Sequence, residues 1–179
     1  MCIDDWDTAN VIRAAGGERS RVSETDIYRQ LKNALARRAP FQRNLVVRVE
    51  NYAAVGFPDV HLTATPGIEA WVELKTLESD FVIRVRNTQL LWLDSRARLG
   101  RFRDFVLAAD SAHVAVYPAA RVLRAWRDVR EDVLRLPRVP ASRTPLRPLP
   151  ASLAPNRRSG WDETVDFLFT SDVESLYHV

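Results

Sequence analysis

Apolar residues recur at helical spacing in several segments of the chain. In the first segment, Ile27, Leu31 and Leu35 lie on one face, and Pro40 ends the pattern. The Ser-Glu-Thr-Asp run at 23–26 supplies N-cap candidates for a helix that continues to about residue 38. We expect further helices at about 88–99 and 120–136, and a helical pattern in the tail from residue 161.

Short runs rich in β-branched residues predict strands between these helices. We expect strands at 45–50, 60–64, 71–75, 104–109 and 113–118, and an extended piece at 81–86. Thr65-Pro66-Gly67 would turn the chain between the second and third strands. Helices interleaved with strands in this order predict an α/β fold.

A hairpin centred on Pro66 would bring three polar side chains to one face of the sheet. Asp59 and Glu73 each lie seven positions from Pro66, so they would stand opposite each other in an antiparallel pair. Lys75 would share their face, because side chains alternate along a strand with a period of two. A bulge in the loop would shift this register.

Glu73 and Lys75 stand in an otherwise apolar strand, WVELK at 71–75. Burying a carboxylate beside an ammonium costs free energy unless something binds them. Two interpretations follow: an exposed strand face with a surface ion pair, or a metal site. Lys75 and Lys32 are the only lysines among 26 basic residues, and an ammonium shifts its pKa more readily than a guanidinium does. This usage favours chemistry at Lys75.

The composition favours one domain with appendages. The chain has 179 residues, of which 46% are hydrophobic, enough for a sizeable core. No apolar run approaches the roughly 18 residues of a membrane span, and the N-terminus lacks the pattern of a secretory signal. Cys2 is the only cysteine, which excludes a disulfide framework and a cysteine-rich zinc site. We expect a cytoplasmic protein with no membrane partner.

Charge is distributed unevenly in the C-terminal third. Residues 119–158 hold ten arginines and three acidic residues, whereas residues 159–179 hold five acidic residues and no lysine or arginine. A basic band of this kind is typical of a polyanion-binding surface, and we expect Arg124, Arg127 and Arg130 to contact nucleic acid or a second protomer. The alternative is that these arginines only keep a helix and a linker in solution. Residues 137–158 contain six prolines and predict an extended arm or linker.

Three short motifs occur in an order that resembles the PD-(D/E)xK nuclease superfamily. They are GFPD at 56–59, WVELK at 71–75 and QLLWL at 89–93. The closest likeness is to small phage and archaeal resolvase-like and VRR-NUC-type nucleases, over residues 24–118. The resemblance implies a restriction-endonuclease-like core at 23–136, with a central mixed sheet of about four to five strands flanked by helices. Residues 1–22 would be an N-terminal extension, and 137–179 a proline- and arginine-rich arm with an acidic tail.

The same resemblance implies roles for individual residues. Asp59, Glu73 and the backbone carbonyl of Leu74 would bind Mg²⁺, with Mn²⁺ as a substitute, because hard cations take oxygen ligands. Lys75 would orient the attacking water, stabilise developing charge or act as a base. Gln89 would contact water or phosphate beside the lysine.

Two further acids compete for a place at the metal. Glu50 ends the strand that leads into the first motif, and Glu24 begins the first helix, where resolvase-like relatives often keep a glutamate. We rank Glu50 ahead of Glu24, because a helix favours acidic residues in its first turn for other reasons.

The resemblance implies a metal-dependent endonuclease that hydrolyses DNA phosphodiester bonds, is of phage origin and acts in the cytoplasm of a bacterial or phage-infected host cell. Branched or junction DNA is one candidate substrate, and flaps, nicked or plain duplex and single strands remain open. Two alternatives remain open. One is a catalytically silent DNA-binding or assembly protein on the same fold, and the other is a nuclease directed at RNA. A resolvase-like enzyme would also have a reason to form a homodimer, since two symmetric cuts need two sites.

Overall fold

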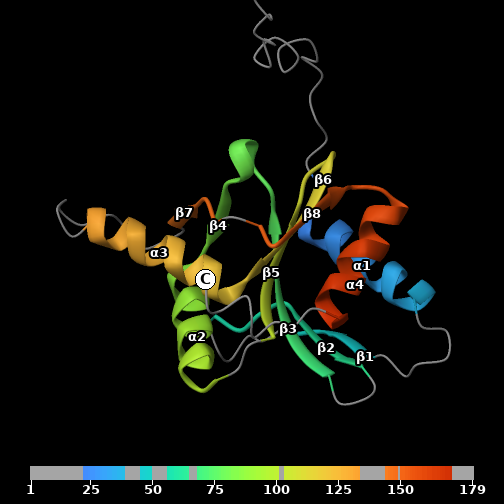
Figure 1. Cartoon of the computed structure of the whole chain (residues 1–179), viewed down its shortest axis with the longest axis horizontal. Coiled ribbons are helices and arrows are strands. Elements are labelled where there is room, and N and C mark those ends of the chain that lie inside the picture. The colour runs from blue at the N-terminus through green and yellow to red at the C-terminus, as the bar shows by residue number, and fades with distance from the viewer. Residues whose placement is uncertain are drawn as a thin grey trace, which may run out of the picture.

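The computed structural model describes residues 22–38, 45–49, 56–64, 68–100, 103–133, 144–148 and 150–170. Most of the expected N-terminal extension, Glu50, the turn at 65–67 and the last nine residues lie outside these ranges, as does the side chain of Arg130. The described chain forms an α/β fold, with a mixed six-stranded sheet flanked by four helices (Figure 1).

The main sheet has the strand order β1-β2-β3-β5-β6-β8. Its strands are β1 (Leu45–Arg48), β2 (Val60–Ala64), β3 (Ile68–Thr76), β5 (Asp104–Ala109), β6 (His113–Pro118) and β8 (Ser152–Pro155). β3 and β5 are parallel, and every other neighbouring pair is antiparallel. A second, two-stranded sheet pairs β4 (Ile83–Val85) with β7 (Thr144–Leu146), and the short helix η1 (Ser79–Phe81) precedes β4.

The helices cover the two faces of the main sheet in pairs. α1 (Glu24–Arg38) and α4 (Arg158–Thr170) pack on one face, around buried residues such as Leu31, Leu74 and Trp161. α2 (Asn87–Arg98) and α3 (Ala119–Val133) lie on the other face with the small sheet, around Leu90, Tyr117 and other buried residues. Figure 1 shows the sheet passing between these two pairs. Alternation along each strand therefore supplies both cores from one sheet.

The local predictions agree closely with the structure. β2, β5 and β6 have the expected bounds, and α1, α2 and α3 lie where the apolar periodicity places them. β2 and β3 pair with Val60 opposite Val72 and Ala64 opposite Ile68, which is the register of a hairpin centred on residue 66. Gly100 has a φ of 67° after the last turn of α2, as expected of a glycine at C′.

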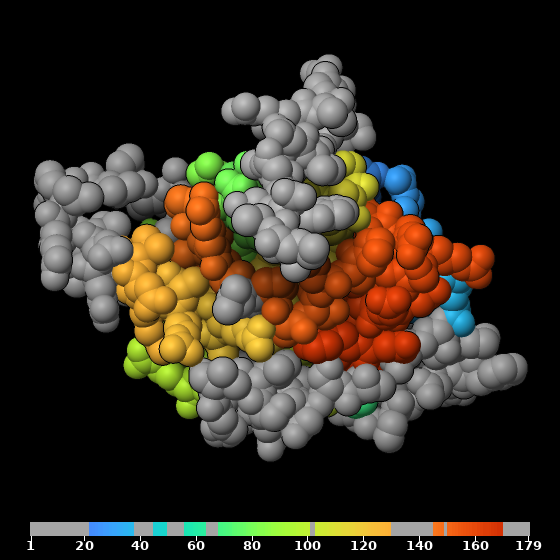
Figure 2. Space-filling view, turned by 45° about the horizontal axis from the view of Figure 1, so that its top comes forward, coloured from blue at the N-terminus to red at the C-terminus, as the bar shows by residue number. Residues whose placement is uncertain are grey.

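The proline-rich segment differs from the expectation of an extended arm. Of residues 137–158, the described part supplies β7 and β8, and β8 pairs with β6 along one edge of the main sheet. Prolines fit here because an outermost strand does not need every N–H for a neighbour, and Pro155 lies at the end of such a strand. α4 then packs against α1 and β8, so the tail docks on the core, as its apolar stripe predicts. Figure 2 shows this segment, coloured orange to red, packed against the rest of the molecule.

Within the described ranges, none of the helices combines the length and the apolar character needed to cross a membrane.

Candidate active site

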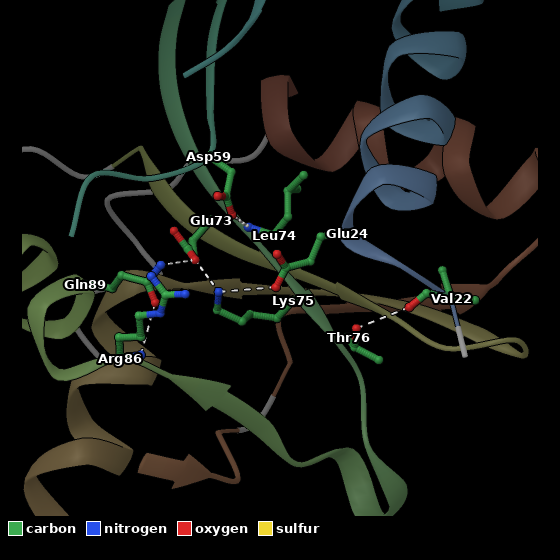
Figure 3. A network of polar contacts seen from close by, with 9 residues as sticks. All are labelled: Val22, Glu24, Asp59, Glu73, Leu74, Lys75, Thr76, Arg86 and Gln89. Carbon is green, nitrogen blue, oxygen red and sulfur yellow. Dashed lines mark hydrogen bonds and ion pairs between the residues drawn. The ribbon is translucent and has the colours of Figure 1, made fainter. Parts of the chain in front are cut away.

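Within the described residues, β3 extends beyond the end of β2, so the C-terminal half of β3 has no strand beside it on that edge. The pairing with β2 ends at Val72, whereas the pairing with β5 continues to Thr76. Val22, just before α1, packs against the core on the α1 face of the sheet, and its carbonyl accepts a hydrogen bond from the Thr76 hydroxyl (3.2 Å). The ends of β2, α1 and α2 thus meet at one half of β3 (Figure 3).

Glu73 is a buried carboxylate with one satisfied oxygen and one unsatisfied oxygen. Its side chain is 2% exposed. Oε1 accepts hydrogen bonds from the Lys75 ammonium and from the Gln89 amide. Oε2 is buried and has no hydrogen-bond partner among the described residues. Burial raises the pKa of Glu73 to about 8, the Lys75 ammonium opposes this rise, and the negative charge of Asp59 adds to it. The positive charge near Glu73 is therefore too small to offset the cost of burying its ionised form.

Lys75 lies between two carboxylates. Its ammonium contacts Glu73 on the same strand face and approaches Oε1 of Glu24 at 3.5 Å. Glu24 occupies the first turn of α1, whose start is fixed by a reciprocal pair of hydrogen bonds. The Asp26 N–H donates to the Ser23 hydroxyl (3.1 Å) and the Ser23 N–H donates to the Asp26 carboxylate (3.2 Å). The sequence ranked Glu24 below Glu50, yet Glu24 is the one that the described structure brings to Lys75.

Asp59 reaches the open edge of β3 directly. Its Oδ2 accepts the N–H of Leu74 (2.9 Å), a bond that a longer β2 would have made with its backbone. The N–H and C=O of one strand residue point to the same side, so the Leu74 carbonyl also faces this edge. The extended hairpin register places Asp59 opposite Glu73, as predicted. Asp59, Glu73 and the Leu74 carbonyl therefore offer oxygen atoms around one half of β3.

The candidate ligand atoms at this edge are all oxygens, the type of ligand that a hard cation prefers. Mg²⁺ binds through one or two carboxylates and keeps several waters, so it does not require a cage of protein ligands. A bound cation would give Oε2 of Glu73 the partner that it lacks among the described residues. Within the described ranges, no group of three or more His, Cys, Asp or Glu side chains is arranged to hold a metal ion by itself.

Gln89 is held in place by the backbone of Arg86, the residue just before α2. The Arg86 N–H donates to Gln89 Oε1 (3.0 Å), and the Gln89 N–H donates to the Arg86 carbonyl (3.0 Å). These two bonds fix the amide so that its Nε2 meets Glu73. The sequence did not single out Arg86, because the usual signal for such a reciprocal cap is a serine or threonine three residues before the glutamine.

Gly56 lets the loop that carries Asp59 approach the first turn of α2. Its φ is 103°, and a Cβ at this position would lie 2.5 Å from the carbonyl oxygen of Thr88. Only glycine adopts this backbone conformation readily at such a close approach. The glycine of the first motif therefore allows the close approach that brings Asp59 and Gln89 to the same site.

Three aromatic rings pack together beside the polar residues. Phe57, Trp71 and Trp92 contact one another with ring centroids 5.5 to 5.8 Å apart. Each ring precedes or follows a site residue by two or three positions in the chain, and Trp92 also packs against the core beneath α2. His61 stacks on Trp71 with centroids 4.3 Å apart and bonds to Glu69. The tryptophans of the second and third motifs thus pack against each other next to the site.

The remaining predicted residues lie on α3 or outside the described part of the chain. Glu50 lies outside the described residues, and so does the side chain of Arg130. Arg124 is exposed on α3. Arg127 is exposed too, but its guanidinium contacts Asp94 of α2 at 3.2 Å, an aspartate that Arg98 also contacts. Arg127 therefore helps to join α3 to α2.

The sequence matches no model of a known protein family, and no curated protein matches it significantly. The resemblance to nucleases therefore rests on the motif residues themselves. Each of the three motifs contributes to the cluster at β3: Asp59 from the first, Glu73 and Lys75 from the second, and Gln89 from the third.

Proposed function

We propose that this protein is a metal-dependent endonuclease that hydrolyses DNA phosphodiester bonds. The observation that carries the proposal is the buried Glu73 carboxylate, which has one oxygen without a partner among the described residues and lies beside Lys75 and Asp59. The element order α1, β1, β2, β3, α2 is compatible with the order of helix and strands on which the resemblance rests. A restriction-endonuclease-like core is part of the same proposal.

Asp59, Glu73 and the Leu74 carbonyl would hold the metal, with Mg²⁺ or Mn²⁺ favoured by an all-oxygen ligand set. When bound, the metal supplies positive charge to the phosphate oxygens and lowers the pKa of a coordinated water toward neutrality. Gln89 occupies Oε1 of Glu73 and so leaves Oε2 for the cation.

Lys75 would act on the attacking water and on the charge that develops at phosphorus. Its ammonium has three N–H donors, and Glu73 and Glu24 hold it at the edge of β3. A donor fixed in this way can orient a water and stabilise an oxyanion without reorganising during the reaction. Glu24 is then a positioning residue, because it acts on Lys75 and not on the substrate.

The test is incubation of the purified protein with duplex, single-stranded, flap and four-way-junction DNA, and with RNA of the same sequence, in Mg²⁺, Mn²⁺, Ca²⁺ or EDTA. We expect cleavage of DNA in Mg²⁺ and Mn²⁺ and none in EDTA. Ca²⁺ should support little cleavage, because it is larger and less demanding in geometry. Full activity in excess EDTA would refute the mechanism, and cleavage of RNA alone would redirect the proposal to an RNA substrate.

A further inference from the structure

The polar cluster at β3 offers groups that would bind the metal and orient the attacking water. It does not explain how a polyanionic strand is held beside buried carboxylates. A phosphodiester carries negative charge, and Glu24, Asp59 and Glu73 carry the same sign when ionised. The metal and Lys75 would offset this repulsion at the reacting phosphate, and a cationic group outside the cluster would do so at a neighbouring phosphate. Arg86 is a basic residue close in the chain to this cluster, since it stands three positions before Gln89.

Arg86 has a fixed backbone next to the site. Its N–H and its carbonyl are both bonded to Gln89, and its carbonyl also accepts the N–H of Leu90 (3.0 Å). In Figure 3 the Arg86 side chain extends alongside Gln89, on the side of the cluster where Glu73 and Lys75 meet. A guanidinium on such an anchor can reach a bound ligand without disturbing the metal ligands.

Arg86 is an exposed residue, and its guanidinium lacks a carboxylate partner among the described residues. Several other arginines of the described chain do have one. Arg84 pairs with Glu78, Arg96 with Asp104, Arg98 and Arg127 with Asp94, and Arg147 with Asp80. The nearby acids of the cluster are engaged elsewhere: Glu73 by Lys75 and Gln89, and Asp59 by the Leu74 N–H.

We propose that Arg86 binds a backbone phosphate of the nucleic acid strand that occupies the β3 site. An unpaired guanidinium offers planar, charged N–H donors that match the geometry of phosphate oxygens. The inference rests on the proposed nuclease function and adds to it a substrate-binding residue. Arg86 does not touch the reacting atoms, so its loss should weaken binding more than it slows the chemical step.

The test compares Arg86→Ala with the matched control Arg84→Ala. Both arginines are exposed, and they are two positions apart, but Arg84 is paired with Glu78. Binding of the full chain to fluorescently labelled duplex and single-stranded DNA is measured over a range of salt concentrations, with Ca²⁺ in place of Mg²⁺. We expect Arg86→Ala to bind about tenfold more weakly and its log–log salt slope to fall by about 0.9 on duplex or about 0.7 on single strands. Arg84→Ala should match the wild type.

Two further measurements separate binding from folding and from chemistry. Arg86→Lys keeps the charge and should restore the salt slope, and thermal unfolding of Arg86→Ala should be unchanged because its backbone bonds to Gln89 remain. In Mg²⁺, Arg86→Ala should raise KM more than it lowers kcat. Wild-type affinity and salt slope in Arg86→Ala, or an equal loss in Arg84→Ala, would overturn the assignment of Arg86 while the nuclease proposal stands. A wild-type protein that neither binds nor cleaves DNA or RNA would overturn both.

Discussion

Two buried carboxylates lie on neighbouring strands of the sheet, and their surroundings differ. Asp104 on β5 is fully buried, and each of its oxygens accepts a hydrogen bond from the guanidinium of Arg96, both at 3.1 Å. Glu73 on β3 is almost as buried, but two donors share Oε1 while Oε2 has no partner among the described residues. Burial alone therefore does not distinguish the two carboxylates; the completeness of their hydrogen bonding does.

The difference separates a structural ion pair from a candidate site. Both oxygens of Asp104 are hydrogen-bonded by one arginine, so the protein itself satisfies this carboxylate. The ion pair also joins α2 to β5. A buried carboxylate with a free oxygen carries a desolvation cost that the protein itself does not offset, which is expected where a ligand is missing. The two acids should consequently respond to mutation in opposite ways.

The largest expected effect is loss of cleavage at the incomplete carboxylate. Asp59→Ala, Glu73→Ala and Lys75→Ala should each lower the cleavage rate by about a thousandfold or more, since each removes charge or a ligand from the reacting groups. Circular dichroism and thermal unfolding should show a folded protein in each case. The matched control is Lys32→Ala, which removes the other lysine, exposed on α1. A Lys75→Ala protein with wild-type turnover would contradict the assignment.

The second prediction concerns Asp104, the carboxylate whose two oxygens are both hydrogen-bonded. Arg96→Ala leaves Asp104 buried without its guanidinium and should lower the free energy of unfolding by about 3 kcal/mol. Cleavage per folded molecule should stay close to that of the wild type. The control is Arg98→Ala on the same helix, whose side chain is 79% exposed and pairs with Asp94; it should cost less than about 1 kcal/mol. Urea unfolding measures both, and equal losses would remove the contrast between the two carboxylates.

The third and smallest expected effect is a stability gain when a cation satisfies Glu73. A metal that binds only the folded state adds about 2.7 kcal/mol at a hundred times its Kd, and each kcal/mol raises Tm by about 3 °C for a chain of this size. Mg²⁺ or Mn²⁺ should therefore raise Tm relative to EDTA. Glu73→Gln should abolish this shift and Arg96→Ala should retain it. An unchanged shift in Glu73→Gln would place the metal elsewhere.

Much of the fold and of the site could be predicted from local patterns. The hairpin register that places Asp59 opposite Glu73 was predicted from their equal spacing from Pro66, because side-chain alternation and a short turn fix a hairpin locally. Helix α1 and strands β2, β5 and β6 followed from apolar periodicity for the same reason. Gln89 could be placed at the start of α2, but its contact with Glu73 could not, since that contact joins separate elements.

The C-terminal third shows where local patterns fail. Strands β7 and β8 are short and contain prolines, so nothing within 144–155 distinguishes them from a linker. Their partners, β4 and β6, lie far away in the chain, and only pairing with those strands gives them a regular structure. Burial of Leu146 and Ala154 in the two cores follows from that pairing.

The sequence by itself determined the register of the hairpin and singled out the residues that we propose to carry the chemistry, because both depend on spacings of a few residues. Tertiary structure alone decided how these residues are surrounded. Glu24 comes from a helix 51 positions before Lys75, and Arg86 reaches Glu73 only through Gln89. The unsatisfied oxygen of Glu73 depends on all of these neighbours at once, since a buried carboxylate is complete or incomplete only relative to the groups that the folded chain packs around it.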